Sequence, residues 1–546
     1  MLNPTVFNTS QICYQLGVKH AVMSPGSRNA PLTISFARHD GIKKWIIPDE
    51  RSAGFVALGI AQETKTPVVL CCTSGSALLN YAPAIAEAYY REIPLIILSA
   101  DRPPELIDQR DGQTIRQFES LKNHVKGSFN LPVISNECDI EDYQARLIEA
   151  MKLSGQLPKG PVHLNIPFSE PFYPEKDQQL TFKNVEIAPS PEKSKNDIVQ
   201  IEASVHKRIL ILIGQNDKDE ELDHLLTSIS KLIPVIKSPL NNLSNGIEYV
   251  DAFIEDQEDL IPDLLVTSGL SVLSKKLKKF LRKHTPKKHF HFDLAGVEVD
   301  TYQSDPELIK GSIKEFLRSL NASQVDGSYL DSWRGYENRT KDALKEFTRE
   351  AKFSESKAAN MVLKSIPDGA MLHLSNSMPV RYADLFGVKE GLACLSNRGT
   401  SGIDGCTSTA VGVSFVSDRL NVLLTGDLAF LYDRNAFFHN YSLHNLRIIV
   451  LNNQGGGIFR LIEGPSNLPE LEDYFETRHN RTAEYICAEN GIDYMTADDE
   501  QSLSNHLEGL FKASDKAKVL EVFTDPEINQ KVYKELKKQI HERINN

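Results

Sequence analysis

The chain of 546 residues carries 61 Lys and Arg against 73 Asp and Glu, which gives a net charge of −12. A phosphate backbone repels a protein of this charge, so we expect no general nucleic-acid binding. Hydrophobic residues make up 41% of the chain, as in ordinary globular proteins, and its length predicts about three or four domains. No apolar run approaches the roughly 18 residues of a membrane span, so we expect none.

The cysteine pattern indicates a reducing compartment. The seven cysteines are odd in number and form no Cys-x-x-Cys pair, which argues against a disulfide framework and a zinc site. Cys71 and Cys72 end an apolar run and are expected to be small buried side chains. The N-terminus shows no signal-peptide pattern, since Lys19 is the first basic residue and no apolar core precedes a cleavage site. We therefore expect a cytoplasmic protein.

Residues 1–180 read as alternating strands and helices. Short apolar runs predict buried strands at 21–23, 45–47, 68–70, 95–98 and 162–164. Helix-like patterns lie between them, including 52–63 and 76–90. This alternation predicts a parallel sheet with helices on both faces.

The pattern repeats twice more along the chain. A polar stretch with prolines, 182–197, reads as a linker. A second α/β domain is expected at 198–325, and a charged helical stretch, 331–357, leads into a third at 350–546. The expected strands are 208–214, 233–236 and 263–267 in the second domain, and 371–374, 422–424, 448–451 and 519–522 in the third. The fold class is therefore α/β, with three consecutive open, mostly parallel sheets.

Polar side chains follow two strands of the third domain. Asp427 comes after the strand at 422–424, and Asn453 begins a glycine-rich turn after the strand at 448–451. In open α/β sheets ligands bind at the carboxyl ends of strands, so these two side chains can converge there. Their oxygens suit magnesium, and the glycines allow a diphosphate to approach the backbone closely. The alternative is an Asp that caps a helix, followed by an ordinary Asn-containing turn.

The two segments resemble the cation–diphosphate motif of the thiamin diphosphate (ThDP)-dependent enzymes, in which Gly-Asp-Gly is followed at a distance by Asn-Asn. This chain has Leu428 in place of the last glycine of the first segment, a departure that leaves both side-chain ligands intact. The resemblance implies a third cation ligand at the main-chain oxygen of Gly455. The cation would be Mg²⁺ or Mn²⁺, which the sequence does not distinguish.

The same resemblance assigns a role to Glu50, which follows the strand at 45–47. In ThDP enzymes a glutamate at this place hydrogen-bonds the aminopyrimidine ring of the cofactor and acts as an acid/base. The alternative is a carboxylate at a helix start, where the helix dipole favours negative charge.

A narrower match joins six segments: 24–32, 49–53, 100–106, 113–117, 396–399 and 401–405. Together they resemble the MenD family, the 2-succinyl-5-enolpyruvyl-6-hydroxy-3-cyclohexene-1-carboxylate synthases of menaquinone biosynthesis. The likeness is good in the first and third domains and weak in the second. It implies a transferase that decarboxylates 2-oxoglutarate and adds the succinyl carbanion equivalent to isochorismate.

Both of these substrates are dianions, and arginine binds carboxylates through two parallel hydrogen bonds. Taken singly, each arginine is better read as part of a surface ion pair, and only its place in the family-specific segments favours substrate binding. The residues that the resemblance assigns to substrate binding are Ser27, Arg28, Arg102, Gln113, Ser377, Arg381, Arg398, Ile458 and Phe459. It assigns Ile403 to the wall that holds the cofactor in its bent conformation.

Lys275 is the residue of the second domain that best matches a substrate contact. The alternative is an amphipathic helix with a solvated basic face. The family also implies a homodimer or homotetramer with active sites at subunit interfaces, so that Glu50 of one subunit serves the cation ligands of another.

Two other kinds of function stay open. The chain could be another ThDP-dependent carboligase or decarboxylase of 2-oxo acids, or a non-catalytic binding member of the fold. The family-specific segments argue against the first, and the presence of Glu50, Asp427 and Asn453 argues against the second. A generic dinucleotide-binding protein fits less well, because no Gly-x-Gly-x-x-Gly follows a strand at a domain start.

Overall fold

The computed structural model describes residues 4–174, 180–188, 207–320, 325–462 and 464–545. The expected linker at 182–197 is therefore seen only up to residue 188, and positions 198–206 of the expected second domain also lie outside the described residues. Within the visible part, the backbone amides of Lys183 and Val185 bond to the side chains of Asn8 and Gln15.

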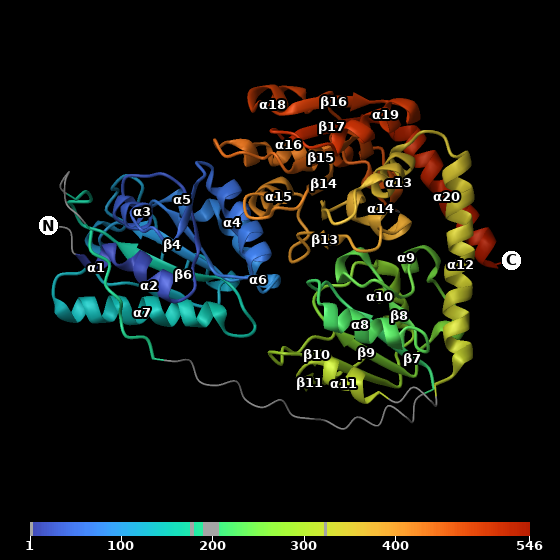
Figure 1. The fold of residues 1–546 in the computed structure, drawn as a ribbon, viewed down its shortest axis with the longest axis horizontal. Helices are drawn as coiled ribbons and strands as arrows, with labels where there is room; N and C mark the ends of the chain where they lie inside the picture. Colours follow the sequence, from blue (N-terminus) through green and yellow to red (C-terminus); the bar gives the residue numbers. More distant parts are fainter. Residues whose placement is uncertain (1–3, 175–179, 189–206, 321–324, 463, 546) are drawn as a thin grey trace. The chain divides into compact units, whose positions relative to one another are not determined.

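The first sheet has six parallel strands in the order β2-β1-β3-β4-β6-β5 (Figure 1). They are β1 (His20–Met23), β2 (Lys43–Ile46), β3 (Val68–Cys72), β4 (Leu95–Asp101), β5 (Ser128–Asn130) and β6 (Val162–Pro167). Strands β3, β4 and β6 are buried along their whole length, as expected where helices cover both faces. Cys71 and Cys72 are fully buried as predicted, and all seven cysteines are free.

The helices around this sheet are α1 (Pro4–Phe7), α2 (Thr9–Gln15), α3 (Ala30–Ala37), α4 (Glu50–Thr64), α5 (Ser76–Asn80), α6 (Ala82–Tyr90) and α7 (Glu137–Gly155). The single helix predicted at 76–90 is wrong in one respect, because it breaks at Tyr81. Pro83 lacks a backbone donor, and its ring would clash with the preceding turn of a continuous helix.

Helix α15 (Cys406–Ser414) packs directly against α4. A Cβ at Gly59 would lie 2.2 Å from the carbonyl oxygen of Thr409, and one at Gly412 would lie 2.1 Å from that of Val56. The two backbones therefore touch where both helices carry glycine, and a larger side chain at either position would push them apart.

The second sheet has five parallel strands in the order β11-β10-β9-β7-β8. These are β7 (Ile209–Ile213), β8 (Val235–Ile236), β9 (Leu264–Ser268), β10 (Lys288–Asp293) and β11 (Glu307–Lys310). Its helices are α8 (Glu220–Ile229), α9 (Val250–Phe253), α10 (Lys275–Lys283) and α11 (Ile313–Ser319).

The charged helical stretch predicted at 331–357 is two helices, α12 (Gly327–Glu350) and α13 (Glu355–Ser365). The break falls before Ser354, whose side chain accepts a hydrogen bond from the Lys357 backbone and so starts the new helix. The long helices α12 and α20 (Pro526–Asn545) lie side by side (Figure 1).

The third sheet has six parallel strands in the order β13-β12-β14-β15-β17-β16. These are β12 (Met371–Leu374), β13 (Ala393–Leu395), β14 (Asn421–Gly426), β15 (Leu446–Asn452), β16 (Asp493–Ala497) and β17 (Lys518–Phe523). Its helices include α14 (Met378–Phe386), α16 (Asp427–Tyr432), α17 (Ile458–Leu461), α18 (Glu484–Glu489) and α19 (Glu500–Leu510), with a π-helix, η9 (Leu471–Glu476).

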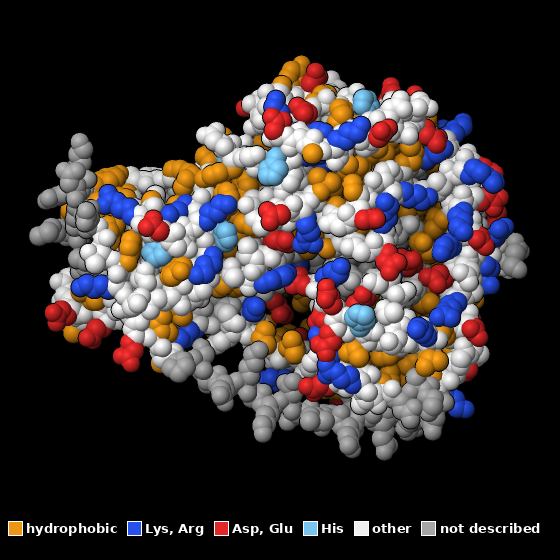
Figure 2. Space-filling view, viewed as in Figure 1, with side chains coloured by type: hydrophobic (Ala, Val, Ile, Leu, Met, Phe, Trp, Pro, Cys, Tyr) orange, Lys and Arg blue, Asp and Glu red, His pale blue; other side chains and the backbone are white. Residues whose placement is uncertain are grey.

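The three parallel α/β sheets confirm the predicted fold class. By internal contacts the chain divides into two compact units: residues 1–193, 397–418 and 432–444 form unit 1, and the remainder forms unit 2. Unit 2 thus holds the second and third sheets, and the exact domain boundaries stay a prediction. Among the described helices, none is both long and apolar enough to cross a membrane. On the face drawn in Figure 2, basic and acidic side chains are interspersed.

Candidate active site

Asp427 lies at the edge of the third sheet where two neighbouring strands end. Strand β14 ends at Gly426, which pairs with Leu451 near the end of β15. The buried Asp427 carboxylate accepts hydrogen bonds from the backbone of Leu428 at 2.6 Å and of Gly455 at 3.0 Å. The fold therefore brings the backbone of Gly455 to Asp427 through its amide, while the role of its carbonyl as a cation ligand stays a prediction. Leu428, the departure from the family pattern, contributes a backbone donor that fixes the aspartate.

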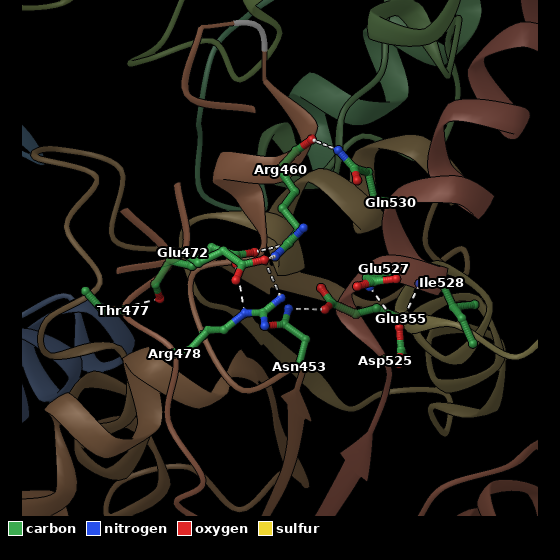
Figure 3. Close-up of polar contacts among 12 residues, drawn as sticks. Glu355, Asn453, Arg460, Glu472, Thr477, Arg478, Asp525, Glu527, Ile528 and Gln530 are labelled. Carbon is green, nitrogen blue, oxygen red and sulfur yellow. Dashed lines mark hydrogen bonds and ion pairs between the residues drawn. The ribbon is translucent and has the colours of Figure 1, made fainter. Parts of the chain in front are cut away.

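Asn453 lies beside the same carboxylate. Its amide nitrogen donates to the buried Glu355, as Figure 3 shows, and its amide oxygen is buried without a hydrogen-bond partner. Burial raises the pKa of Glu355 to about 7, and the charge of Asp427 acts in the same direction. Asn453 thus bonds to a glutamate that also feels the charge of Asp427.

This edge suits a divalent cation. An aspartate carboxylate, an amide oxygen and a backbone carbonyl are the hard oxygen donors that Mg²⁺ and Mn²⁺ accept. The unpartnered oxygen of Asn453 is compatible with a cation here, because buried polar atoms are nearly always paired. In the described residues no group of three or more His, Cys, Asp or Glu side chains suits a metal.

The glycine turn after β15 is held by an ion-pair network that sequence reasoning missed. A Cβ at Gly455 would lie 2.8 Å from the carbonyl oxygen of Glu476, and the Gly456 amide donates to that same oxygen at 2.7 Å. Figure 3 shows Arg460 beside Glu472; it pairs with Glu476 and, at 2.7 Å, with Glu472. The buried Arg460 therefore fixes the π-helix against which the turn packs.

His479 is another neighbour of Asp427 that no sequence motif predicted. Its Nε2 lies 3.4 Å from the Asp427 carboxylate, and its backbone amide donates to the carbonyl of Gln454. Glu355 could not be predicted from the sequence either, since a Ser-Glu pair before an apolar run indicates only the start of a helix. Only the folded chain brings these residues to Asp427.

Glu50 is the first residue of α4, at the edge of the first sheet. The helix is capped by Asp49, whose side chain accepts from the backbone of Arg51 at 2.9 Å and of Ser52 at 3.3 Å. Asp49 therefore caps the helix without help from Glu50. The position of Glu50 in the first turn also fits the alternative of a carboxylate at a helix start. Burial raises the pKa of the half-buried Glu50 carboxyl, and the charge of Asp49 adds to this. A raised pKa suits a group that exchanges protons near neutral pH.

Ser27, Arg28 and Arg102 also follow strand ends of the first sheet, and Gln113 lies in the loop after β4. The Arg28 guanidinium donates to the Phe168 carbonyl at 2.8 Å and stacks on the Phe172 ring, while Ser27 bonds to Tyr173. Arg102 follows β4 and donates to the Gly112 carbonyl at 2.7 Å, beside Gln113.

Arg398 and Ile403 belong to the same compact unit. The backbone amides of Gly399 and Thr400 donate to the buried Glu87 of α6 at 2.9 and 2.7 Å, which fixes the loop that carries Arg398. Ile403 is 37% exposed and precedes α15. An aliphatic side chain left so open is available to cover a ligand.

The remaining candidates lie in unit 2. Lys275, Arg381 and Ile458 line one cavity of about 620 Å³. Ser377 and Phe459 are sequence neighbours of lining residues but do not line the cavity themselves. Arg381 also donates to the carbonyl of Ser377, which starts α14 with a positive φ of 75°. Lys276 lines the same cavity as Lys275 and pairs there with Glu255, while Lys283 pairs with Asp256.

Comparison with known proteins first gives the class. A family model described as "Thiamine pyrophosphate enzyme, N-terminal TPP binding domain" matches residues 9–121. Thiamine pyrophosphate is another name for ThDP, so the α/β sheets and this match define a ThDP enzyme.

Full-length relatives then give the family. The chain is 42% identical to the 2-succinyl-5-enolpyruvyl-6-hydroxy-3-cyclohexene-1-carboxylate synthase of Cytophaga hutchinsonii, over 98% of this chain and 99% of that protein. It is 38% identical to the synthases of Flavobacterium johnsoniae and Porphyromonas gingivalis, over 97% and 93% of this chain and 98% and 92% of theirs. The chain belongs to this family of synthases.

Proposed function

We propose that this protein decarboxylates 2-oxoglutarate and adds the resulting succinyl unit to isochorismate, in menaquinone biosynthesis. The observation that carries the proposal is the similarity to named synthases over nearly the whole of both chains. When bound, ThDP would supply the electron sink that the decarboxylation of a 2-oxo acid requires.

The edge of the third sheet would hold the cofactor's diphosphate through a cation. We assign Asp427, Asn453 and the carbonyl of Gly455 to Mg²⁺ or Mn²⁺. The buried carboxylate and the unpartnered amide oxygen support this assignment. The glycines that follow leave the backbone open to phosphate oxygens.

The edge of the first sheet would supply the acid/base group, Glu50, and part of the substrate-binding site. Glu50 would share a proton with the ring nitrogen of the aminopyrimidine, and its raised pKa supports that role. We assign the substrate carboxylates and their surroundings to Ser27, Arg28, Arg102, Gln113, Lys275, Ser377, Arg381, Arg398, Ile458 and Phe459, and the support of the cofactor's shape to Ile403. Arg28 and Arg102 are already fixed by backbone carbonyls, which lowers the entropy lost on binding.

We also propose an oligomeric state and a cellular location for the protein. Family likeness favours a homodimer or homotetramer whose active sites form between subunits. Seven free cysteines fit a cytoplasmic location, where thiols stay reduced.

The test is a complete assay. Purified protein is incubated with ThDP, Mg²⁺, 2-oxoglutarate and isochorismate, and the loss of isochorismate is followed by its ultraviolet absorbance. We expect loss only with all components present, and we expect it to fall about 10² to 10⁴-fold in Glu50→Gln. Glu63→Gln, the same substitution at the other end of α4, is the matched control and should keep wild-type activity.

The other outcomes separate the alternatives. Turnover of pyruvate in place of 2-oxoglutarate would indicate a different ThDP-dependent 2-oxo acid enzyme. Cofactor binding with no turnover of any 2-oxo acid would indicate a binding member of the fold. Absence of ThDP binding would overturn the assignment of the cation edge itself.

A further inference from the structure

Two consecutive asparagines end β15 and follow it, and each gives its side-chain nitrogen to a buried glutamate. Asn452 donates to Glu521 at 2.7 Å, and Asn453 donates to Glu355. Both glutamates are almost fully buried. The two pairs have the same chemistry and differ in what the opposite atom of each amide does.

The amide oxygen of Asn452 is used by the protein, whereas that of Asn453 is not. Asn452 Oδ1 accepts the backbone amide of Gln454 at 2.9 Å, so its pair serves the turn. Asn453 Oδ1 is buried and has no hydrogen-bond partner. A buried acceptor without a donor costs about 1–3 kcal/mol, so its position requires an explanation outside the folded chain.

Glu355 decides which way the Asn453 amide points. The nitrogen and oxygen ends of an asparagine have nearly the same shape, and only their partners distinguish them. A carboxylate can only accept, so it attracts the nitrogen and repels the oxygen. The oxygen is therefore turned away from Glu355, on the residue that shares this strand edge with Asp427.

The glutamate is itself held in place from several sides. Its backbone amide donates to the side chain of Asn529 at 2.8 Å, and the Tyr382 hydroxyl bonds to its carboxylate. Gly457 leaves room for the amide, since a Cβ there would lie 2.6 Å from Asn453 Nδ2. The orientation of Asn453 is thus built into the fold before any ligand binds.

We propose that Glu355 is a positioning residue for the divalent cation. It acts through Asn453, because it fixes the amide so that Oδ1 is presented to the cation. Glu355 itself does not ligate the cation. This inference rests on the proposed cation site and adds a residue that the sequence motif does not contain. Partners of metal ligands typically contribute about 10 to 100-fold in metal affinity.

The test compares Glu355→Gln with Glu521→Gln. A glutamine at 355 can offer its own amide hydrogens to Asn453 Oδ1, so the preferred orientation is lost while the volume is kept. Binding of Mn²⁺ is measured by the electron paramagnetic resonance signal of the free ion, with saturating ThDP. We expect the Kd for Mn²⁺ to rise about 10 to 100-fold in Glu355→Gln. In Glu521→Gln we expect a lower melting temperature and a Kd within about twofold of wild type.

A double-mutant cycle shows whether Glu355 acts through Asn453. In an Asn453→Ala background, the added Glu355→Gln change should leave the Kd for Mn²⁺ unaltered, because no amide is left to orient. Melting of the cation-free proteins, followed by circular dichroism, shows that each variant is folded.

Three results would contradict the inference or its basis. An unchanged Kd in Glu355→Gln overturns it, and so do equal rises in the Glu355 and Glu521 variants, which would indicate general damage. If the wild-type protein with ThDP binds no Mn²⁺, the proposed cation site fails instead. The failures of the two proposals are therefore distinguishable.

Discussion

The edges of the first and third sheets have the same architecture but differ in the hydrogen-bond partners of their polar side chains. In both, polar residues follow the carboxyl ends of parallel strands. At the first edge the charged groups already have protein partners: Arg28 bonds to the Phe168 carbonyl, and Arg102 bonds to the Gly112 carbonyl. At the third edge the Asn453 oxygen is buried and has none.

This difference indicates which edge needs a ligand to be complete. At the first edge Arg28 also buries one unpartnered nitrogen, Nε, but its guanidinium is held by the Phe168 carbonyl. The third edge buries an acceptor at a cost of about 1–3 kcal/mol. A cation bound there would recover that cost and stabilise unit 2 by mass action. We therefore expect cation-dependent behaviour to originate at Asp427 and Asn453.

The largest effect should come from removing the aspartate. Asp427→Ala takes away the single carboxylate assigned to the cation and the acceptor of the Gly455 amide. We expect ThDP affinity at fixed Mg²⁺ to fall about a hundredfold or more, since even indirect partners of metal ligands contribute up to that amount. Isothermal titration calorimetry measures it. Arg102→Met, at the other edge, should keep ThDP affinity within about twofold of wild type; an equal loss in both variants would contradict the distinction.

A mixing experiment tests whether the two edges serve one site from two chains. Glu50→Gln and Asp427→Ala proteins, each inactive, are unfolded together and refolded as a mixture. If the site forms between subunits of a dimer, about a quarter of the wild-type activity should return, because each mixed dimer has one intact site. If both edges of a site belong to one chain, no activity should return. Refolded wild-type protein sets the scale.

Removing an arginine should have a smaller effect and a different signature. Arg381→Met leaves the cation ligands in place and removes a charge from the wall of the cavity. A hydrogen bond to a charged group contributes about 1.5–3 kcal/mol, so we expect the KM for one of the two dianions to rise about 10 to 100-fold. Steady-state kinetics with each substrate varied in turn identifies which one. A fall in kcat with both KM values unchanged would contradict a binding role.

The sequence predicted the α/β class and the long buried strands, because these depend on local patterns, but not the short strands β5, β11, β13 and β16. The cation edge stays a prediction. Buried parallel strands are continuous apolar runs in the sequence. Asp427 and Asn453 can be recognised because they are polar residues directly after such runs. Glu355, His479 and the ion pairs of Arg460 escaped, because each is placed by packing between segments distant in sequence. The asymmetry between Asn452 and Asn453 escaped for the same reason: the two residues are identical in sequence and differ only in what their oxygens meet.

The smallest effect concerns a buried acid of unit 1 whose partners are supplied by the protein. Asp433 accepts hydrogen bonds from the backbone and hydroxyl of Ser408, and it faces the charges of Arg51 and Asp404. Burial raises the pKa of Asp433 to about 7. The folded state therefore keeps a proton that the unfolded chain releases near pH 4, so this group's contribution to stability falls as pH rises from about 4 to about 7.

Asp433→Asn replaces the protonated acid with a neutral side chain of the same shape and should remove this decline. Relative to wild type, the melting temperature of the variant should rise with pH across that window, by about 3 °C in total. Differential scanning fluorimetry at a series of pH values measures it, and the difference should be the same with and without Mg²⁺ and ThDP. Since Ser408 already satisfies Asp433, a ligand at the third edge has nothing to add there. A pH response that vanished on adding Mg²⁺ and ThDP would mean that Asp433 is energetically coupled to the third edge. The contrast between this satisfied acid and the unpartnered Asn453 oxygen would then fail.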